Sequence, residues 1–200
     1  MKLFSHPFSP YGRKVKIAAK VKGVFDDIEV LTVDTNKGDA ELSRHNPLAK
    51  IPALVIAGGM TIFDSHVICE YLDSLKPTPV LFPKSGAERW RVLTLGALGD
   101  GMLDAALLLV YEHRFRPEEK IVQSWKDRQQ AKVDGALAQL EANLPPFEGT
   151  PDYGSLTIAA ALGYLDFRHE GKWRGKCPKL VHWLDRFAQA VPAFAATKPS

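Results

Sequence analysis

The chain has 200 residues, of which 46% are hydrophobic and 24% charged, a composition typical of globular proteins and not of disordered ones. Its 26 basic and 23 acidic side chains leave a net charge of +3. No stretch concentrates the basic residues, so nucleic acid is not the expected partner. The length suits one large domain or two small ones.

The sequence predicts neither a metal centre nor a membrane span. The two cysteines, Cys69 and Cys177, are far apart and form no metal-type cluster, which favours a reducing compartment. The N-terminus is interrupted by Pro7 and Pro10 and lacks the apolar core of a signal peptide. The longest apolar run, 105–111, has seven residues, against the roughly 20 that cross a bilayer. A soluble cytoplasmic protein is expected.

Short strands and helices alternate in the first part of the chain. Residues 10–22 carry apolar side chains at helical spacing behind Pro10, and residues 28–33 alternate as a half-buried strand does. Gly58 and Gly59 form a two-residue turn typical of a hairpin. We expect strands at 2–5, 28–33, 52–57 and 60–63, and helices at 10–22, 39–45 and 65–75. The predicted order is β-α-β-α-β-β-α.

A proline-rich segment separates this part from a helical one. Residues 77–87 contain three prolines, which stop helices, so they are predicted to be a linker. No strand pattern follows. Helices are predicted at 88–115, from about 118 to 143, at 156–167, and around 180–187, and the nearly apolar 156–167 is expected at the centre. The predicted domains are therefore an α/β domain over 1–76 and an all-helical domain over 88–200.

Ser9 lies where the first strand gives way to a helix, within Ser9-Pro10-Tyr11-Gly12. A side chain there faces the free N–H groups of the first helical turn and the positive end of the helix dipole. A hydroxyl at this point can hydrogen-bond a bound thiolate and lower its pKa. It can equally well act as a helix cap, a common use of serine. Both interpretations remain open on the residues alone.

Ile51-Pro52 precedes the third predicted strand. Most X-Pro bonds in folded proteins are trans, so the residues alone favour trans. A cis bond would turn the Ile51 backbone outward, where it can pair with an extended peptide ligand. The alternative is a proline that simply starts a strand.

Asp64 and Ser65 stand at the start of the helix predicted at 65–75. Such a pair is usually only a cap. It can also bind both ends of an amino acid, with Asp64 on the ammonium and Ser65 with nearby N–H groups on the carboxylate. Lys50 is a candidate partner for a second carboxylate, although a lone lysine is more often simply exposed to solvent.

Three motifs in order resemble the glutathione transferase superfamily. They are Ser9-Pro10-Tyr11-Gly12-Arg13-Lys14-Val15, Asn46 through Leu54, and Phe63-Asp64-Ser65 followed by Ile68 and Glu70-Tyr71-Leu72. The resemblance continues to residues 163–168 and covers nearly the whole chain. It is greatest to the small bacterial members that carry serine or cysteine at the helix start.

The resemblance implies a thioredoxin-like first domain that binds glutathione as cosubstrate, without a metal. Ser9 falls at the position that activates the glutathione thiol. Ile51 would pair its backbone with the cysteinyl part, while Asp64 and Ser65 would bind the γ-glutamyl end. Lys50 matches a residue near the glycyl carboxylate.

The second domain is expected to build the pocket for a small hydrophobic electrophile. Candidate residues are Tyr11 from the first domain and, from the helix 88–115, Asp100, Met102, Leu103, Ala106, Tyr111 and Arg114. An apolar stripe at this spacing is more often core or subunit interface. Arg114 and Arg168 are candidates for pairing with an anionic substrate, and equally for surface ion pairs.

The resemblance also implies a homodimer with the helix 88–115 at its interface. The sequence departs from the family pattern at the start of the buried second-domain helix, where Asp152 and Ser155 appear with the roles of a capping box exchanged. Serine at position 9 cannot form a mixed disulfide, which favours thiolate transfer over a cysteine-based reductase. An isomerase, a dehalogenase, a two-glutathione reductase and a non-catalytic binding protein remain alternatives.

Overall fold

The computed structural model describes residues 1–199, and within them the chain forms two compact units. The first comprises Met1–Lys84 together with the segment from Val191 onward, and the second is Ser85–Ala190. The domain boundaries predicted from sequence (1–76, a linker at 77–87, and 88–200) remain predictions, and Ser200 lies outside the described residues.

The first unit is built on a four-stranded sheet in the order β2-β1-β3-β4. Its strands are β1 (Lys2–Ser5), β2 (Glu29–Thr32), β3 (Ala53–Val55) and β4 (Thr61–Ile62). β1 is parallel to β2 and antiparallel to β3, and β3 is antiparallel to β4. The strands occupy the predicted places but are shorter. The alternation predicted for 28–33 holds over residues 30–33, which are exposed, half-buried, exposed and buried in turn, with Leu31 packed against the core.

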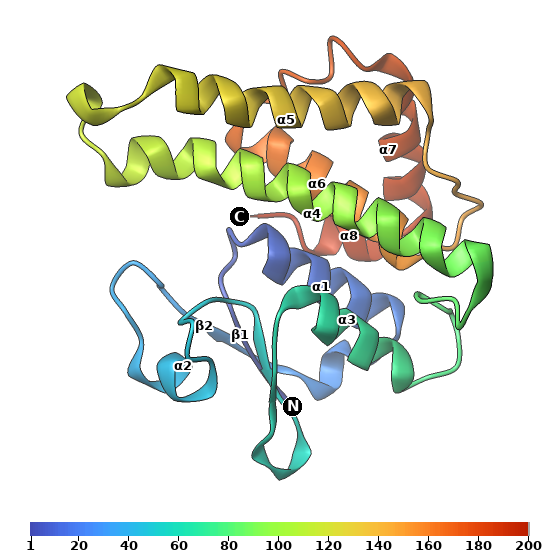
Figure 1. Cartoon of the computed structure of the whole chain (residues 1–200). Helices are drawn as coiled ribbons and strands as arrows, with labels where there is room; N and C mark the ends of the chain where they lie inside the picture. Colours follow the sequence, from blue (N-terminus) through green and yellow to red (C-terminus); the bar gives the residue numbers. More distant parts are fainter. Residues whose placement is uncertain (200) are drawn as a thin grey trace. The chain divides into compact units, whose positions relative to one another are not determined.

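Three main helices complete the predicted β-α-β-α-β-β-α order, which is thereby confirmed. They are α1 (Pro10–Val21), α2 (Ala40–His45) and α3 (Ser65–Ser74), with short 3₁₀ turns at Phe25–Asp27 (η1) and Ala57–Gly59 (η2). Figure 1 shows α1 and α3 side by side. Gly58 and Gly59 both have φ of +82°, a left-handed conformation that glycine adopts without steric cost. The predicted hairpin is confirmed, but its two-residue turn is wrong, because residues 56–60 connect β3 to β4.

A buried ion pair anchors the segment that follows α3. The Lys22 side chain is fully buried and its Nζ donates to Asp73 Oδ1 at 2.8 Å and to the Lys76 and Pro79 carbonyls at 2.6 Å each. The Asp73 carboxylate in turn accepts the backbone N–H groups of 81–82. The first part of the predicted linker is therefore fixed in the first unit.

A short helix near the C-terminus, α8 (Pro192–Ala196), belongs to the first unit and was not predicted. It packs on α1, where Arg13 donates to the Phe194 carbonyl at 2.8 Å and its guanidinium lies 4.2 Å from the centre of the Phe194 ring. Five residues are too few to show a helical period in the sequence.

The second unit is all helical, as expected. It contains α4 (Gly86–Phe115), α5 (Gln123–Ala142), α6 (Tyr153–Arg168) and α7 (Pro178–Ala190), with a 3₁₀ turn at Glu118–Lys120 (η3). The long helices α4 and α5 lie side by side (Figure 1), and α6 packs against α4. Every residue of Tyr153–Leu165 is buried, which confirms the central position predicted for this helix. By length and composition alone α4 is apolar enough to cross a membrane, and it packs against both α5 and α6.

The helix predicted from about residue 118 begins later, at Gln123. The buried Glu112 carboxylate on α4 pairs with Arg116. Just before Gln123 the Val122 backbone is extended, with φ and ψ of −98° and 107°, so the helix starts only after it.

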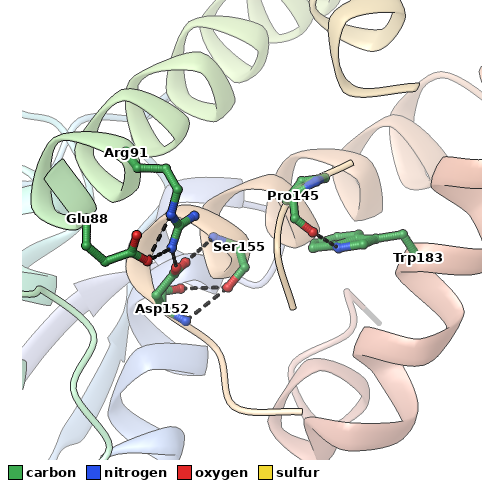
Figure 2. A network of polar contacts seen from close by, with 6 residues as sticks. All are labelled: Glu88, Arg91, Pro145, Asp152, Ser155 and Trp183. Carbon is green, nitrogen blue, oxygen red and sulfur yellow. Dashed lines mark hydrogen bonds and ion pairs between the residues drawn. The ribbon is translucent and has the colours of Figure 1, made fainter. Parts of the chain in front are cut away.

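A capping box starts the central helix α6, as Figure 2 shows. Asp152 Oδ1 accepts the Ser155 N–H at 2.7 Å, and Ser155 Oγ accepts the Asp152 N–H at 3.0 Å. Arg91 from α4 joins Asp152 at 2.6 Å and also pairs with Glu88. The exchanged residue types therefore still form the cap, because the side-chain oxygens of Asp152 and Ser155 can each accept the backbone N–H of the other residue.

Candidate functional site

The sheet topology gathers the three sequence motifs at one edge. Phe4, near the end of β1, pairs with Ala53 at the start of β3, and Ile62 at the end of β4 pairs with Leu54. Since β3 runs opposite to β1 and β4, the start of β3 and the ends of its two neighbours lie on the same side of the sheet. We call this side, formed by strand ends, the sheet edge. The segments that lead to α1, into β3 and into α3 therefore all meet the sheet there.

A shared core cluster holds two of these segments in place. Phe4, Val33 and Ala53 are among its fully buried members. Ile51 and Phe63, the residue before Asp64, both pack against it. Ile51 and the residue before the cap of α3 are therefore both held by the same core cluster.

Ser9 is the N-cap of α1. Its Oγ accepts the Gly12 N–H at 3.1 Å, and its φ and ψ of −78° and 118° are extended, as a cap requires. Pro10 follows at the first helical position. The capping interpretation of Ser9 is therefore confirmed, whereas a role in thiol activation stays a prediction. Because the oxygen only accepts in the cap, the hydroxyl hydrogen is still free to donate.

Gly12 lets this first turn pack closely on the end of β1. A Cβ built at Gly12 would lie 2.2 Å from Ser5 Oγ. Ser5 is only 1% exposed, and its hydroxyl has no hydrogen-bond partner within residues 1–199. Sequence analysis did not predict this contact, because it depends on the approach of two elements.

The Ile51–Pro52 peptide bond is cis, as the resemblance implies and contrary to what the residues alone favour. The Ile51 backbone makes no hydrogen bond within residues 1–199. It is therefore available to an extended ligand.

The buried Asn46 shapes the turn that leads to this bond, a role that sequence analysis did not assign. Its Oδ1 accepts the Leu48 N–H at 3.0 Å, and its Nδ2 donates to the Lys50 carbonyl at 2.8 Å. Ala49, between them, has a φ of +49°, which is uncommon for a residue with a side chain. The only signal in the sequence is an Asn-Pro pair, which is typical of turns. The Lys50 side chain is exposed.

Asp64 caps α3, accepting the His66 N–H at 3.0 Å, and its side chain is exposed. Ser65, the first residue of the helix, is buried. The first-turn N–H groups of a helix have no partner inside it and present a positive dipole end. The capping interpretation is confirmed here too, and the arrangement can hold an ammonium and a carboxylate side by side.

The candidate electrophile residues differ in accessibility. Met102, Leu103 and Ala106 on α4 are buried, whereas Tyr111 is half-buried and Arg114 is exposed. Two further candidates are Asp100, which accepts the Tyr153 hydroxyl at 3.0 Å, and Tyr11, which is half-buried in the first turn of α1. Their assignment to a pocket remains a prediction.

The two cysteines lie in different parts of the chain, one in α3 and the other just before α7. Cys69 and Cys177 are both buried, and burial raises the pKa of the Cys177 thiol. Among the side chains of residues 1–199, no group of three His, Cys, Asp or Glu is placed to hold a metal ion.

Comparisons with known proteins cover both parts of the chain. The family model for the glutathione S-transferase N-terminal domain matches residues 8–75, and that for the C-terminal domain matches residues 123–186. The chain is 34% identical to the uncharacterized GST-like protein YibF of Escherichia coli, covering 100% of this chain and 98% of YibF. It is 30% identical to glutathione S-transferase Z1 of Arabidopsis thaliana, covering 100% and 95%.

A solved structure resembles the whole chain. The crystal structure of a glutathione transferase family member from Pseudomonas fluorescens, with bound glutathione, matches with a TM-score of 0.93 and 40% sequence identity. The match covers 100% of this chain and 98% of that protein.

Proposed function

The chain belongs to the glutathione S-transferase superfamily, and from this we propose that it binds glutathione, activates the thiolate and adds it to a small hydrophobic electrophile. One observation carries the proposal. The segments with Ser9, Ile51 and Asp64 meet at one sheet edge, and a relative with the same fold binds glutathione.

Each part of the tripeptide has a proposed partner. The exposed Asp64 carboxylate takes the γ-glutamyl ammonium, and Ser65 with the first-turn N–H groups of α3 takes the adjacent carboxylate. The unpaired Ile51 backbone bonds the cysteinyl residue as a strand would. Lys50, exposed beside it, pairs with the glycyl carboxylate.

Ser9 acts on the sulfur while it caps the helix. Its oxygen accepts the Gly12 N–H and its hydrogen donates to the thiolate, so the two roles are compatible. A free thiol of this type has a pKa near 8.5, and each unit by which the pKa falls corresponds to about 1.4 kcal/mol. A hydrogen bond to a charged group contributes about 1.5–3 kcal/mol, so Ser9 lowers the thiol pKa by about one to two units. The thiol proton passes to water, and the thiolate forms a carbon–sulfur bond with the electrophile. In a substitution a leaving group departs with its bonding electron pair, and in an addition a π bond opens and its far carbon takes a proton from water.

Two substitutions separate thiol activation from capping. Glycine is nearly as good an N-cap as serine, so Ser9→Gly removes the hydroxyl at a stability cost of a few tenths of a kcal/mol. We expect the bound thiol pKa, followed by ultraviolet absorbance of the thiolate, to rise by about one to two units in Ser9→Gly. Ser9→Thr retains the hydroxyl and should keep the pKa low. An unchanged pKa in Ser9→Gly would leave Ser9 as a cap only.

Calorimetric titration of glutathione and a panel of neutral electrophiles distinguish the alternative functions. Glutathione binding without addition to neutral electrophiles would favour a reductase, isomerase or dehalogenase. No glutathione binding would favour a binding protein that only shares the fold.

A cytoplasmic homodimer with a role in detoxification, formed through α4, completes the proposal. Trp90 and Phe115 support an interface on this helix, because they leave 66% and 57% of their surface exposed. Sedimentation equilibrium should give twice the monomer mass, and Trp90→Glu should shift it to the monomer. A monomeric wild-type protein would refute the dimer.

A further inference from the structure

A four-residue turn joins β1 to α1 and ends at Ser9. Its sequence is His6-Pro7-Phe8-Ser9, and the Ser9 N–H donates to the His6 carbonyl at 3.0 Å, which closes the turn. Pro7 stands at the second position of the turn, where its fixed φ is favourable. Ser9 is therefore both the last residue of this turn and the cap of α1.

The His6 side chain adds a second hydrogen bond inside the turn. Its Nδ1 accepts the Phe8 N–H at 3.1 Å, and the centres of the two rings lie 5.0 Å apart. Aspartate and asparagine are typical of the first turn position, because their side-chain oxygen accepts the N–H two residues on. Asp34 does this shortly after β2, where it accepts the Asn36 N–H at 3.0 Å. In the turn before Ser9, a histidine nitrogen takes the place of that oxygen.

This bond defines the state of the His6 ring. A ring nitrogen accepts only when it carries no proton, so the bonded form is the neutral ring with its hydrogen on Nε2. The bond lies at the surface of the protein. Water can replace it there, so its loss should loosen the turn and change the stability of the fold only slightly.

The two bonds to His6 bear directly on Ser9. The N–H groups of Phe8 and Ser9 are consecutive, and both are bonded to His6, one through the side chain and one through the carbonyl. Ser9 Oγ accepts the Gly12 N–H at 3.1 Å, and its hydrogen has to reach the glutathione sulfur at the same time. Hydrogen bonds weaken steeply when their geometry is poor, so a displaced Ser9 would activate the thiol less well.

We propose that His6 is a positioning residue for Ser9, because its Nδ1 holds the turn from which the Ser9 hydroxyl donates to the glutathione sulfur. The inference rests on the proposed function, in which Ser9 activates the bound thiol. His6 acts through Ser9 and exchanges no proton with the substrate. Substitutions of His6 should therefore change kcat and the thiol pKa, and leave the KM for glutathione nearly unchanged.

Two variants separate the hydrogen bond from the ring contact. His6→Asn keeps an acceptor for the Phe8 N–H but removes the ring, whereas His6→Phe keeps a ring and removes the acceptor. The first test measures amide hydrogen exchange without glutathione. We expect the Phe8 and Ser9 amides to exchange about fivefold faster in His6→Phe than in His6→Asn, as the loss of one hydrogen bond implies. The Asn36 amide is the internal control and should be unchanged. Equal exchange of Phe8 and Ser9 in the two variants overturns the proposal.

The second test compares the same two variants with glutathione bound. Neither asparagine nor phenylalanine titrates, so ultraviolet absorbance of the thiolate reports the thiol without interference from position 6. We expect the thiol pKa to be about 0.5 to 1 unit higher in His6→Phe than in His6→Asn, and kcat to be about threefold to tenfold lower. The KM for glutathione should agree within about twofold. In the Ser9→Gly background the two variants should not differ, because the effect passes through the Ser9 hydroxyl.

The outcomes distinguish this inference from the proposed function. No glutathione binding by the wild type would refute the proposed function and this inference with it. Binding with the same thiol pKa and kcat in His6→Phe and His6→Asn would refute this inference alone. A difference between the two variants that persists in Ser9→Gly would also overturn it, because His6 would then act by another route.

Discussion

The contact between Gly12 and Ser5 predicts that Gly12→Ala destabilises the wild-type protein but stabilises a variant in which Ser5 is alanine. Gly12 lies in the first turn of α1, where alanine favours the helix by about 1 kcal/mol over glycine. The added Cβ, however, would lie 2.2 Å from Ser5 Oγ, while the next nearest atoms, Ser5 Cβ and Ser9 Cβ, are at 3.4 Å. One oxygen atom therefore accounts for nearly all of the steric conflict.

The magnitudes follow from this geometry. Overpacking of a buried contact costs about 1–3 kcal/mol, which exceeds the helix preference, so Gly12→Ala should destabilise the protein by up to about 2 kcal/mol. Ser5→Ala removes a buried hydroxyl without a partner and should be neutral or stabilising. In the Ser5→Ala background the conflict is gone, so Gly12→Ala should stabilise by up to about 1 kcal/mol.

Urea unfolding of the four proteins in this cycle measures the effect. The interaction energy between the two sites should be about 1–3 kcal/mol. An equal cost of Gly12→Ala in both backgrounds would refute the close contact as the reason for glycine. Glutathione titration of the same variants tests whether the turn also positions Ser9, since only Gly12→Ala with Ser5 present should weaken binding.

Three further predictions concern two buried polar groups and the half-buried His169. Lys22→Met leaves the Asp73 carboxylate without its cation and should lower the free energy of unfolding by about 3–5 kcal/mol in urea, whereas a loss under 1 kcal/mol would contradict a buried pair. Asn46→Ala leaves two backbone groups unpaired, so it should lower the free energy of unfolding by about 1–3 kcal/mol. It should also weaken glutathione binding in calorimetry, and unchanged binding would show that Asn46 does not position the site. Burial lowers the pKa of His169 from 6.5, despite its contact with the Ala106 carbonyl, so the unfolded chain takes up the proton first as pH falls. The free energy of unfolding of the wild type should therefore decrease as the pH falls from 6.5 to the lowered pKa, and it should decrease less steeply in His169→Gln. Parallel pH profiles of the wild type and His169→Gln would refute this role of His169.

The fold was predictable where the local pattern is strong. The apolar run from Leu156 and the helical spacing after Pro10 each indicate one element, and the structure contains both. The late start of α5 was not predictable, because no local signal in the sequence marks the extended backbone of Val122 before it. Likewise α8 is too short for its period to be detected.

The candidate site was predictable only in part, for a similar reason. The helix starts at Ser9 and Asp64 carry local capping signals, and the structure confirms both caps. The cis bond before Pro52 was predictable only from the resemblance, since the residues themselves favour trans. The roles of Asn46 and Gly12 depend on contacts made only in the folded chain.

The central claim is that this chain binds glutathione at the sheet edge where its motifs meet. Calorimetric titration of glutathione into the wild type and Asp64→Asn tests it most directly. Asparagine keeps the cap of α3 but removes the charge for the ammonium, and Asp39→Asn, at the cap of α2, is the matched control. We expect micromolar to millimolar binding by the wild type and the control, at least tenfold weaker in Asp64→Asn, as the loss of a charged hydrogen bond implies. No heat of binding in the wild type, or equal affinity in Asp64→Asn, would contradict the claim.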